Sequence, residues 1–396
     1  MVVSRHSRSG KGKVMHGPLR VAVLGTGFVG RQHLEALSRL GATTQVCALA
    51  TADIEQGKRL GSEFGIDKIV SSYSFLLDDR SLDAVHVCTP NSLHFSMVQD
   101  ALLAGKHVLC EKPLATSAEE AQKLTELAWE KGLRNCTGYN LRFYPLVQQM
   151  RSMCQEGDLG EILVVQGTYS QDWLLFETDW NWRVDSRENG PSRAMADIGS
   201  HWCDMAEYVT GRRISSLCAD LQTFHKKRFR PKGFVETFSG KTLVPADYQE
   251  VPVDTEDFGA VIFRMGERTR GSFTASQVAA GRKNYLSIEI YGTKSSVIWD
   301  AESPTQLWIG NRNANNQILV KDPTLMKQYA SYYAELPGGH VEGYNSTFKH
   351  LFRQFYRSIA DGHSQPEYPQ FSDGLRQLTI VEAELASNRC HAWVEV

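Results

Sequence analysis

Apolar residues recur with two different periods along this chain. In the first part, short apolar runs alternate with segments in which apolar residues return every three or four positions, which predicts strands separated by helices. The strands are expected within residues 19–24, 43–50, 83–90 and 106–113, and the helices that follow them end near Gly41, Phe64, Ala104 and Lys131. Strands and helices in this alternation are typical of a doubly wound parallel sheet.

From Ile162 onward the pattern changes. Runs rich in β-branched and aromatic residues are separated by polar or glycine turns, which predicts one large, mostly antiparallel open sheet. A helix over 195–211 separates the first two runs, two amphipathic helices follow within 338–362 and 373–388, and 226–253 is predicted to be a long loop.

The two patterns together predict an α/β fold with two domains. A dinucleotide-binding domain is expected over 19–140, and a domain for substrate binding and oligomerisation over 141–396. Residues 1–18 are basic and polar without an apolar segment, so they are predicted to be a disordered tail.

A glycine-rich turn joins the first predicted strand to the first helix. It consists of Gly25, Thr26, Gly27, Phe28, Val29 and Gly30. In this context the first glycine permits a tight turn, the second lets the backbone approach a pyrophosphate, and the third allows close helix–strand packing. The free N–H groups of the helix would face the phosphates. The turn therefore predicts a dinucleotide site; a glycine turn that serves packing alone is the alternative.

The end of the second predicted strand leaves the type of dinucleotide open. An Asp or Glu usually holds the ribose 2′-hydroxyl there, but Ala50 and Thr51 occupy this place and Asp53 follows late. The nearest basic residues, Lys58 and Arg59, lie well into the next helix. We expect NAD or NADP, with NAD slightly favoured, and Thr51 as the ribose contact.

Polar residues follow the third and fourth predicted strands. Ligands of open α/β sheets bind at the carboxyl ends of strands, so cofactor contacts are predicted at Thr89, Pro90, Asn91, His94, Glu111 and Lys112. Asn91 can instead cap the next helix, and His94 can instead be a residue of the helix surface.

Lys112 has the properties of a catalytic residue. Its ammonium, just beyond a buried strand, can stabilise the negative charge that develops on a substrate oxygen as hydride leaves. Glu111 can pair with that ammonium or hold a cofactor ribose. A solvated lysine is the alternative.

Asp197 and His201 stand four positions apart and share a face of the predicted helix 195–211. An imidazole titrates near neutral pH and suits a general base, and a neighbouring carboxylate can hold it in one tautomer. The alternative is an ordinary pair on a solvated helix surface.

In this order, the glycine turn, "EKP" at 111–113 and "DIGSHWCD" at 197–204 resemble the Gfo/Idh/MocA oxidoreductase family over residues 19–396. The resemblance implies an N-terminal Rossmann domain, an α/β domain with a large open sheet, and NAD(P)-linked chemistry on sugars, inositols or related polyols. It places the catalytic residues at Lys112, Asp197 and His201. The segments "GTYSQDW" and "GYNLRFYP" look closest to the levoglucosan-dehydrogenase-like branch, whereas the missing acid after the second strand departs from the family pattern.

Aromatic and amide side chains gather after the first run of the second half. Gln171, Trp173 and Trp182 suit a sugar, which offers apolar C–H faces and a rim of hydroxyl groups. Arg142 and His340 are predicted to reach the same substrate. The alternatives are that the tryptophans belong to a core or an interface and that His340 is structural.

Composition narrows the class of protein. The 396 residues carry a formal net charge of −2 without a basic stripe, which gives no case for nucleic-acid binding. No apolar run approaches the roughly 20 residues that span a bilayer. The eight cysteines are scattered and no metal-ligand spacing occurs, so no metal is predicted and a reducing cytoplasm is expected.

The sequence therefore predicts an NAD(P)-dependent dehydrogenase acting on a CH–OH group of a sugar, glycoside or polyol. His201 would take the hydroxyl proton while Lys112 polarises the same oxygen. A redox-neutral glycosidase or lyase with tightly held NAD is the alternative, and a non-catalytic dinucleotide-binding protein is less favoured. A homo-oligomer, dimer or tetramer, is expected because a large uncovered sheet face is usually buried against another subunit.

Overall fold

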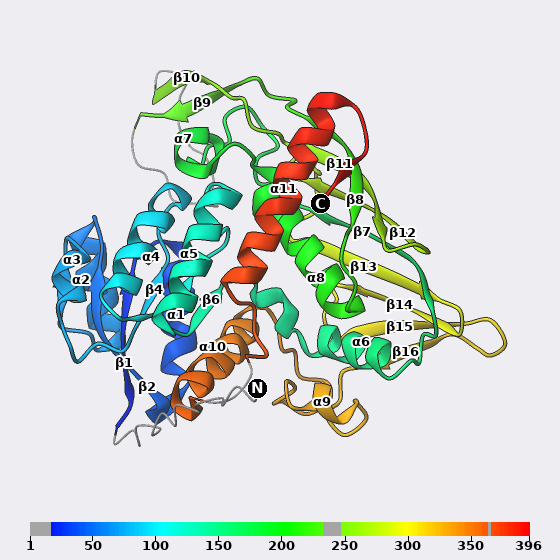
Figure 1. Ribbon diagram of the computed structural model, residues 1–396, viewed down its shortest axis with the longest axis horizontal. Coiled ribbons are helices and arrows are strands. Elements are labelled where there is room, and N and C mark those ends of the chain that lie inside the picture. Colours follow the sequence, from blue (N-terminus) through cyan, green and yellow to red (C-terminus); the bar gives the residue numbers. More distant parts are fainter. Residues whose placement is uncertain (1–16, 233–246, 363–365) are drawn as a thin grey trace, which may run out of the picture.

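The first unit of the molecule is built on a six-stranded parallel sheet in the order β3-β2-β1-β4-β5-β6. The computed structural model describes residues 17–232, 247–362 and 366–396 (Figure 1). The strands are β1 (Leu19–Leu24), β2 (Thr44–Ala50), β3 (Ile69–Val70), β4 (Ala84–Val87), β5 (His107–Cys110) and β6 (Asn135–Thr137). This order is that of a doubly wound dinucleotide-binding sheet, so the predicted class of the first unit is confirmed.

Helices cover both faces of this sheet. They are α1 (Phe28–Ser38), α2 (Ile54–Phe64), α3 (Ser74–Leu77), α4 (His94–Leu103) and α5 (Ala118–Lys131), with short 3₁₀ turns η1 (Gly41–Thr43), η2 (Asn91–Leu93) and η3 (Asn140–Phe143). Their ends follow local chemistry: the Asp53 side chain accepts a hydrogen bond from Gln56 N at the start of α2, and Gly65 ends that helix in the left-handed conformation.

The second unit is a nine-stranded sheet in the order β16-β15-β14-β13-β7-β12-β11-β8-β17. Its strands are β7 (Ile162–Ser170), β8 (Ser216–Gln222), β11 (Phe258–Met265), β12 (Thr269–Ser276), β13 (Tyr285–Gly292), β14 (Ser295–Asp300), β15 (Gln306–Asn311), β16 (Gln317–Val320) and β17 (Val394–Glu395). Only β7 and β12 pair in parallel among these strands, so the predicted large and mostly antiparallel sheet is confirmed.

Two helices pack on the inner face of the large sheet: α6 (Pro145–Gln155) and the segment predicted over 195–211. That segment begins as a π-helical turn, η5 (Met195–Gly199), and continues as α8 (Ser200–Thr210). Trp202 is fully buried, stacks on Phe273 with ring centroids 4.5 Å apart, and donates its indole N–H to Ser287 O at 2.9 Å. This packing fixes the helix, and the residues at its start, against the sheet.

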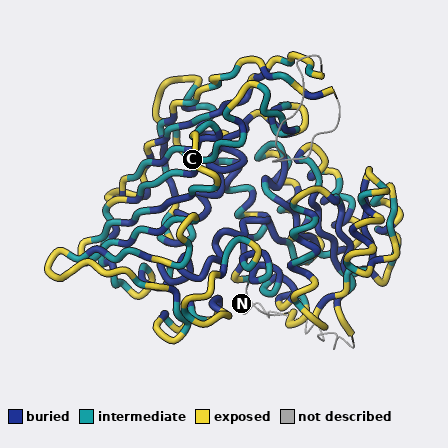
Figure 2. Tube along the Cα trace, turned by 180° about the vertical axis from the view of Figure 1, so that it is seen from behind, coloured by how far each residue is buried: buried dark blue, intermediate teal, exposed yellow. Residues whose placement is uncertain are grey.

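The late helices α10 (Tyr344–Asp361) and α11 (Phe371–Cys390) join the two units. Phe348, Leu351, Phe352 and Tyr356 of α10 belong to the same core as β1 of the first unit. Helix α11 runs between α5 and β8, as Figure 1 shows. In Figure 2 buried positions follow both sheets and exposed ones the connecting loops. Residues beyond 140 therefore complete the core of the first unit.

The predicted loop 226–253 is replaced in part by a two-stranded sheet. Its ends pair as β9 (Lys227–Pro231) and β10 (Tyr248–Pro252), while 233–246 lie outside the described residues. The predicted tail, 1–18, falls almost wholly on residues outside the description. Short elements that the sequence did not indicate are η4 (Trp182–Val184), α7 (Ser186–Asn189) and α9 (Gln328–Ser331). Within the described residues, no helix combines the length and apolarity needed to cross a membrane.

Candidate active site

The glycine turn fits a dinucleotide pyrophosphate. Gly25 adopts φ +99°, and a Cβ atom there would lie 2.5 Å from Cys88 O. A Cβ on Gly30 would lie 2.1 Å from Gly25 O, whereas one on Gly27 would meet no atom within 4 Å. Gly27 is also the N-cap of α1, and no side chain caps the start of that helix. These features leave room for the phosphates that such helix starts bind.

Side chains near the turn stabilise its conformation. The hydroxyl groups of Thr26 and Thr51 lie 2.6 Å apart, which ties the glycine turn to the end of β2, and Thr51 is buried. Asp53, the late acid of the sequence, caps α2. Phe28 is half exposed and Val29 partly buried at the start of α1. A ribose contact by Thr51 stays a prediction.

The residues after β4 divide between a surface and an interior role. Thr89 and Pro90 are partly exposed at the strand end. Asn91 does not cap α4: its amide donates to Asn189 O and Oδ1 at 3.0 Å each, which joins the two units. His94 is fully buried, with its ring nitrogens 2.7 Å from Pro113 O and 2.9 Å from Thr89 O. It is therefore not a residue of the helix surface, and a ribose contact by His94 stays a prediction.

Lys112 and Asp197 meet across the boundary between the two units. Lys112 Nζ donates to Asp197 Oδ1 at 2.7 Å and to Asp197 O at 2.8 Å. Gln277 Nε2 donates to the other carboxylate oxygen at 2.9 Å, and Arg183 Nε lies 3.3 Å from Oδ1. Burial opposes ionisation of Asp197, but the cations Lys112 and Arg183 outweigh it and hold the pKa of this carboxyl below its ordinary value.

His201 stands beside this group without joining it. No hydrogen bond links His201 to Asp197 or to any other described residue, and its ring contacts Tyr139 and Tyr169 at centroid distances of 5.4 and 6.4 Å. The expectation that Asp197 holds the imidazole in one tautomer is therefore wrong. The π-helical turn at Asp197 breaks the i,i+4 alignment of an α-helix, and three donors already engage the carboxylate.

The imidazole of His201 is nevertheless poised in its neutral form. Burial lowers the pKa of His201 well below its ordinary value, the Lys112 ammonium acts in the same direction, and Asp197 acts against them. A neutral imidazole has a lone pair with which it can accept a proton.

Glu256 anchors the start of the π-helical turn. Its Oε1 accepts hydrogen bonds from Ser192 Oγ at 2.7 Å, Arg193 N at 2.8 Å and Met195 N at 2.9 Å. A single buried carboxylate oxygen thus satisfies the backbone N–H groups that lead into the turn, and it places Asp197 in front of Lys112.

Glu111 does not pair with the Lys112 ammonium. Its Oε1 lies 2.9 Å from His33 Nε2 inside the first unit, and its Oε2 accepts the Lys112 backbone N–H at 3.3 Å. A ribose contact by Glu111 stays a prediction.

A set of polar and aromatic side chains extends from His201 along the large sheet. The Tyr169 hydroxyl and Gln171 Nε2 both donate to Asn284 Oδ1, at 2.7 and 2.9 Å, and Trp173 Nε1 donates to Gln171 Oε1 at 2.7 Å. The contact of Tyr169 with His201 brings Gln171 and Trp173 toward the reaction centre.

Trp182 enters the same group through Arg183, whose guanidinium lies 4.4 Å from the Trp182 ring centroid. Arg183 belongs to the segment that was predicted to suit a sugar, whereas Gln277 and Asn284 were not predicted as site residues. Arg183 adjoins Trp182 in a predicted segment, but no local pattern marks the other two.

Two predicted substrate residues lie elsewhere. Arg142 is buried, its guanidinium pairs with the carboxylates of Asp204 and Asp373, and it packs over the Tyr208 ring at 4.7 Å. These partners use its hydrogen-bond donors in the interior, so we assign it a structural role. His340 is exposed in a loop, with Nδ1 3.3 Å from Gly338 O, and no contact in the described structure brings it to Lys112 or His201.

One group of potential metal ligands occurs in the described residues: Glu335, Glu342 and His350. Both carboxylates already have cationic partners, since Glu342 pairs with buried Lys321 at 2.7 Å and Glu335 with Lys349 and Arg353. This surplus of cations opposes a metal ion, and we assign no metal site there. All eight cysteines are free thiols.

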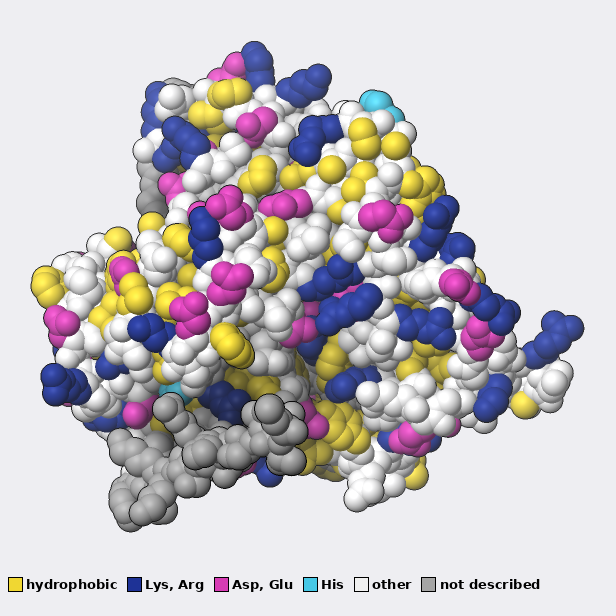
Figure 3. Space-filling view, in the orientation of Figure 1, with side chains coloured by type: hydrophobic (Ala, Val, Ile, Leu, Met, Phe, Trp, Pro, Cys, Tyr) yellow, Lys and Arg dark blue, Asp and Glu magenta, His cyan; other side chains and the backbone are white. Residues whose placement is uncertain are grey.

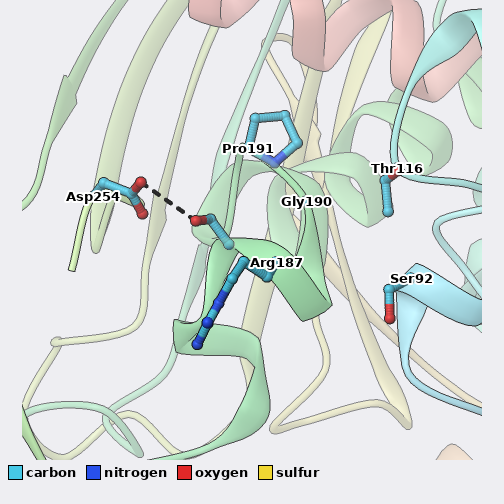
Figure 4. A pocket seen from close by; sticks show the side chains of 7 residues that line it. Ser92, Thr116, Arg187, Gly190, Pro191 and Asp254 are labelled. Atoms are coloured by element: carbon cyan, nitrogen blue, oxygen red, sulfur yellow. Dashed lines mark hydrogen bonds between the residues drawn. The ribbon is translucent and has the colours of Figure 1, made fainter. Parts of the chain in front are cut away.

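An open pocket of about 470 Å³ lies away from the reaction centre, between α7 and the residues that precede α4 and α5 (Figure 4). It is lined by Ser92, Thr116, Ser186, Arg187, Gly190, Pro191 and Asp254. Ser186 donates to Asp254 at 3.3 Å, and the lining includes none of Lys112, Asp197 and His201. We therefore do not assign the reaction to this pocket.

Lys, Arg, Asp and Glu are mixed over the face of the molecule that Figure 3 shows, without a patch of one sign.

Both units of the molecule are similar to known protein families. Residues 19–139 match the model of an oxidoreductase family with an NAD-binding Rossmann fold, and 147–298 match the GFO/IDH/MocA C-terminal domain. The chain is 30% identical to levoglucosan dehydrogenase of Pseudarthrobacter phenanthrenivorans over 391 residues, 96% of this chain and 98% of that protein. It is 28% identical to glucose-6-phosphate 3-dehydrogenase of Bacillus subtilis, covering 92% of this chain and 94% of that one.

Solved structures of similar proteins match this chain over nearly its whole length. A levoglucosan dehydrogenase in complex with NADH and levoglucosan matches with a TM-score of 0.86 at 28% identity, covering 96% of this chain and 99% of that one. An inositol dehydrogenase homologue complexed with NAD⁺ from Azotobacter vinelandii matches with a TM-score of 0.84 at 26% identity, covering 97% and 99%.

Proposed function

Because this chain belongs to the GFO/IDH/MocA family of oxidoreductases, we propose that it transfers hydride between a CH–OH carbon of a sugar, glycoside or polyol and a nicotinamide dinucleotide. The observation that carries the proposal is the ion pair of Lys112 and Asp197 at the carboxyl end of β5, with His201 alongside. Ligands of a doubly wound sheet bind at this end of its strands.

The roles of the side chains follow from their surroundings. A bound nicotinamide would supply the hydride acceptor. His201 accepts the proton of the substrate hydroxyl, because burial and Lys112 keep its imidazole neutral. Lys112 stabilises the negative charge that develops on that oxygen.

Asp197 has a different role from the one the sequence predicts. It holds the Lys112 ammonium in place through two hydrogen bonds, one to its carboxylate and one to its backbone carbonyl. Gln277 and Arg183 in turn hold the carboxylate. Asp197 therefore positions the lysine and leaves the imidazole free for the substrate.

The relatives suggest the substrate class. Levoglucosan, glucose 6-phosphate and inositol appear in their names, and the side chains of Gln171, Trp173 and Asn284 near Tyr169 offer the mixture of amide and aromatic groups that suits a hydroxyl-rich ring.

The test is the absorbance of reduced nicotinamide with purified protein, NAD⁺ or NADP⁺, and a panel of anhydrosugars, glycosides, inositols and sugar phosphates. We expect stoichiometric reduction with at least one member of the panel. If a glycoside is consumed without net reduction, the redox-neutral glycosidase or lyase replaces this proposal. Tight dinucleotide binding with no turnover of any member would contradict it.

A further inference from the structure

Four polar side chains form a buried hydrogen-bonded chain in the first unit, and none of them belongs to the group of Lys112, Asp197 and His201. Glu111 Oε1 lies 2.9 Å from His33 Nε2, His33 Nδ1 lies 2.9 Å from His86 Nδ1, and His86 Nε2 lies 2.7 Å from the Tyr356 hydroxyl. Three of these residues have no exposed surface, and Glu111 is 7% exposed. Polar groups in such a place are costly unless every one of them is satisfied.

Aromatic rings enclose the chain. Phe352 meets His33 and His86 edge-on, with centroids 4.8 and 4.7 Å apart, and Phe348 tilts against His33 at 5.4 Å. The four hydrogen-bonded side chains are therefore surrounded by apolar groups from α10. Hydrogen bonds in such an apolar environment are stronger than they are in water.

The order of protons along the chain follows from its end at Glu111. An ionised carboxylate can only accept, so His33 Nε2 must carry a hydrogen. A neutral His33 then has a lone pair on Nδ1, which requires that His86 Nδ1 donates. This leaves the lone pair of His86 on Nε2, where the Tyr356 hydroxyl donates. Each hydrogen bond thus fixes the direction of the next.

The neighbouring groups agree with this order. Burial lowers the pKa of His86 well below its ordinary value, so the ring carries one proton, and burial raises the pKa of Tyr356, so its hydroxyl keeps the hydrogen. Cys88 Sγ lies 3.1 Å from His33 Nδ1, and burial raises the pKa of this thiol as well. The thiol therefore keeps its hydrogen, and the single lone pair of His33 Nδ1 is the acceptor for His86 Nδ1.

The chain ends at the reaction centre. The Glu111 carboxylate accepts the backbone N–H of Lys112 at 3.3 Å and lies against Gly138, where a Cβ atom would come within 2.6 Å of Oε1. We propose that Tyr356, His86 and His33 form a proton-ordered chain that fixes the Glu111 carboxylate against the Lys112 backbone. His33, His86 and Tyr356 are then positioning residues of the reaction centre. The kinetic part of this inference rests on the proposed function.

The decisive variant is Tyr356→Phe, because it removes one hydroxyl and keeps the ring. His86 Nε2 then loses the one donor that it has among the described residues, so the opposite tautomers of both histidines become accessible. A lone pair of His33 can then face the Glu111 carboxylate. The matched control is Tyr368→Phe. Tyr368 is also buried and packs on Phe355, but its hydroxyl lies 2.7 Å from Ser358 Oγ, outside the chain.

Two measurements test the proposal. The ¹⁵N spectrum of histidine-labelled protein is expected to show His33 protonated on Nε2 alone and His86 on Nδ1 alone, with assignments from His33→Gln and His86→Gln. Turnover in Tyr356→Phe is expected to fall about tenfold, the effect of roughly one unfavourable buried hydrogen bond. Tyr368→Phe should turn over like the wild type, and both variants should melt at similarly lowered temperatures.

A doubly protonated His33, or the opposite tautomers, would overturn the ordered chain. Wild-type turnover in a folded Tyr356→Phe protein would overturn the positioning role. Because the spectrum needs no substrate, it decides on the chain even if the proposed reaction is not found, and it does so on the wild-type protein if the variants fail to fold.

Discussion

At the scale of single residues, the imidazole of His201 differs from Lys112 and Asp197 in its hydrogen bonding. Lys112 and Asp197 bind each other, whereas the imidazole has no hydrogen-bond partner among the described residues and lies between two tyrosine rings. A buried imidazole in this situation keeps both nitrogens available for a substrate.

The first prediction concerns this residue. His201→Ala should reduce turnover by about 10²–10⁴-fold, the usual contribution of a general base, while the affinity for NADH, measured by fluorescence titration, stays unchanged. His340→Ala is the control, because that histidine is exposed and its described contact is with Gly338 rather than with the reaction centre. A rate near that of the wild type in His201→Ala would rule out the assignment.

A second prediction follows from the low pKa of Asp197. Because the folded protein holds this carboxyl ionised, its ionisation stabilises the fold above the unfolded pKa of about 4 and is lost as pH falls below it. Asp197→Asn should lower the free energy of unfolding at pH 7, and this difference should become smaller at pH 3, where its loss has begun, as urea titrations would measure. It should also reduce turnover at least tenfold, because Lys112 loses its anchor. Equal destabilisation at both pH values would contradict the electrostatic account.

Residue identities were easier to predict than residue partners. Lys112, Asp197 and the glycines stand in short motifs with a defined order. Their partners do not: His33 and His86 are 53 positions apart, and His86 and Tyr356 are 270 apart. Periodicity reports a face of a local element and carries no information on such pairs. Arg142 shows the same limit, since Asp204 and Asp373 meet it only in the folded chain.

At the scale of elements, the strands and helices of the first unit follow the sequence pattern closely because alternation and caps are local. In the second unit, η5 differs from the expectation: an α-helix was predicted and a π-helical turn occurs. The apolar spacing of the segment is compatible with both, and the difference is set by Glu256, a residue from a distant loop.

A third prediction concerns the packing of α11 behind this turn. Glu384 is buried, and neither carboxylate oxygen has a hydrogen-bond partner in the described structure. Burial raises its pKa well above the ordinary value, and Glu256 acts in the same direction. The folded state thus binds this proton more tightly than the unfolded state, so stability falls as pH rises above about 4.3.

The substitution Glu384→Gln replaces the ionisable carboxyl by a neutral amide and so removes the loss of stability at high pH. The variant should be more stable than the wild type at pH 8, by about 1.4 kcal/mol for each unit by which the pKa is raised, and the gain should vanish near pH 4. Urea unfolding at the two pH values measures it, with the exposed Glu130→Gln as the control. A variant less stable than the wild type at pH 8 would contradict the prediction.

At the scale of the whole molecule, the outer face of the nine-stranded sheet is open. Strand registers place one row of side chains across it: Ile262, Ser272, Gln166, Glu289, Ile298, Trp308 and Ile318. Ile262 is 51% exposed and Ile318 is 61% exposed. Exposed apolar side chains of this size are typical of surfaces that contact another subunit.

The homo-oligomer therefore stays a prediction with a direct test. Light scattering after size-exclusion chromatography should give a multiple of 44.4 kDa, and Ile262→Asp should reduce the mass to that of one chain, because it would bury a charge in the interface. Trp129→Asp is the control, since Trp129 is 83% exposed on the first unit. A wild-type protein that elutes as a single chain would refute the prediction.

The return of α10 to the first sheet has a consequence for the making of the protein. The N-terminal strands leave the ribosome first, but Tyr356, which completes their core, follows His86 by 270 positions. At bacterial and eukaryotic rates of synthesis this delay is about 15–50 s. During that time the nascent sheet shows apolar surface to the cell. Chains that terminate early keep this surface exposed, and chaperones or proteases can recognise them by it.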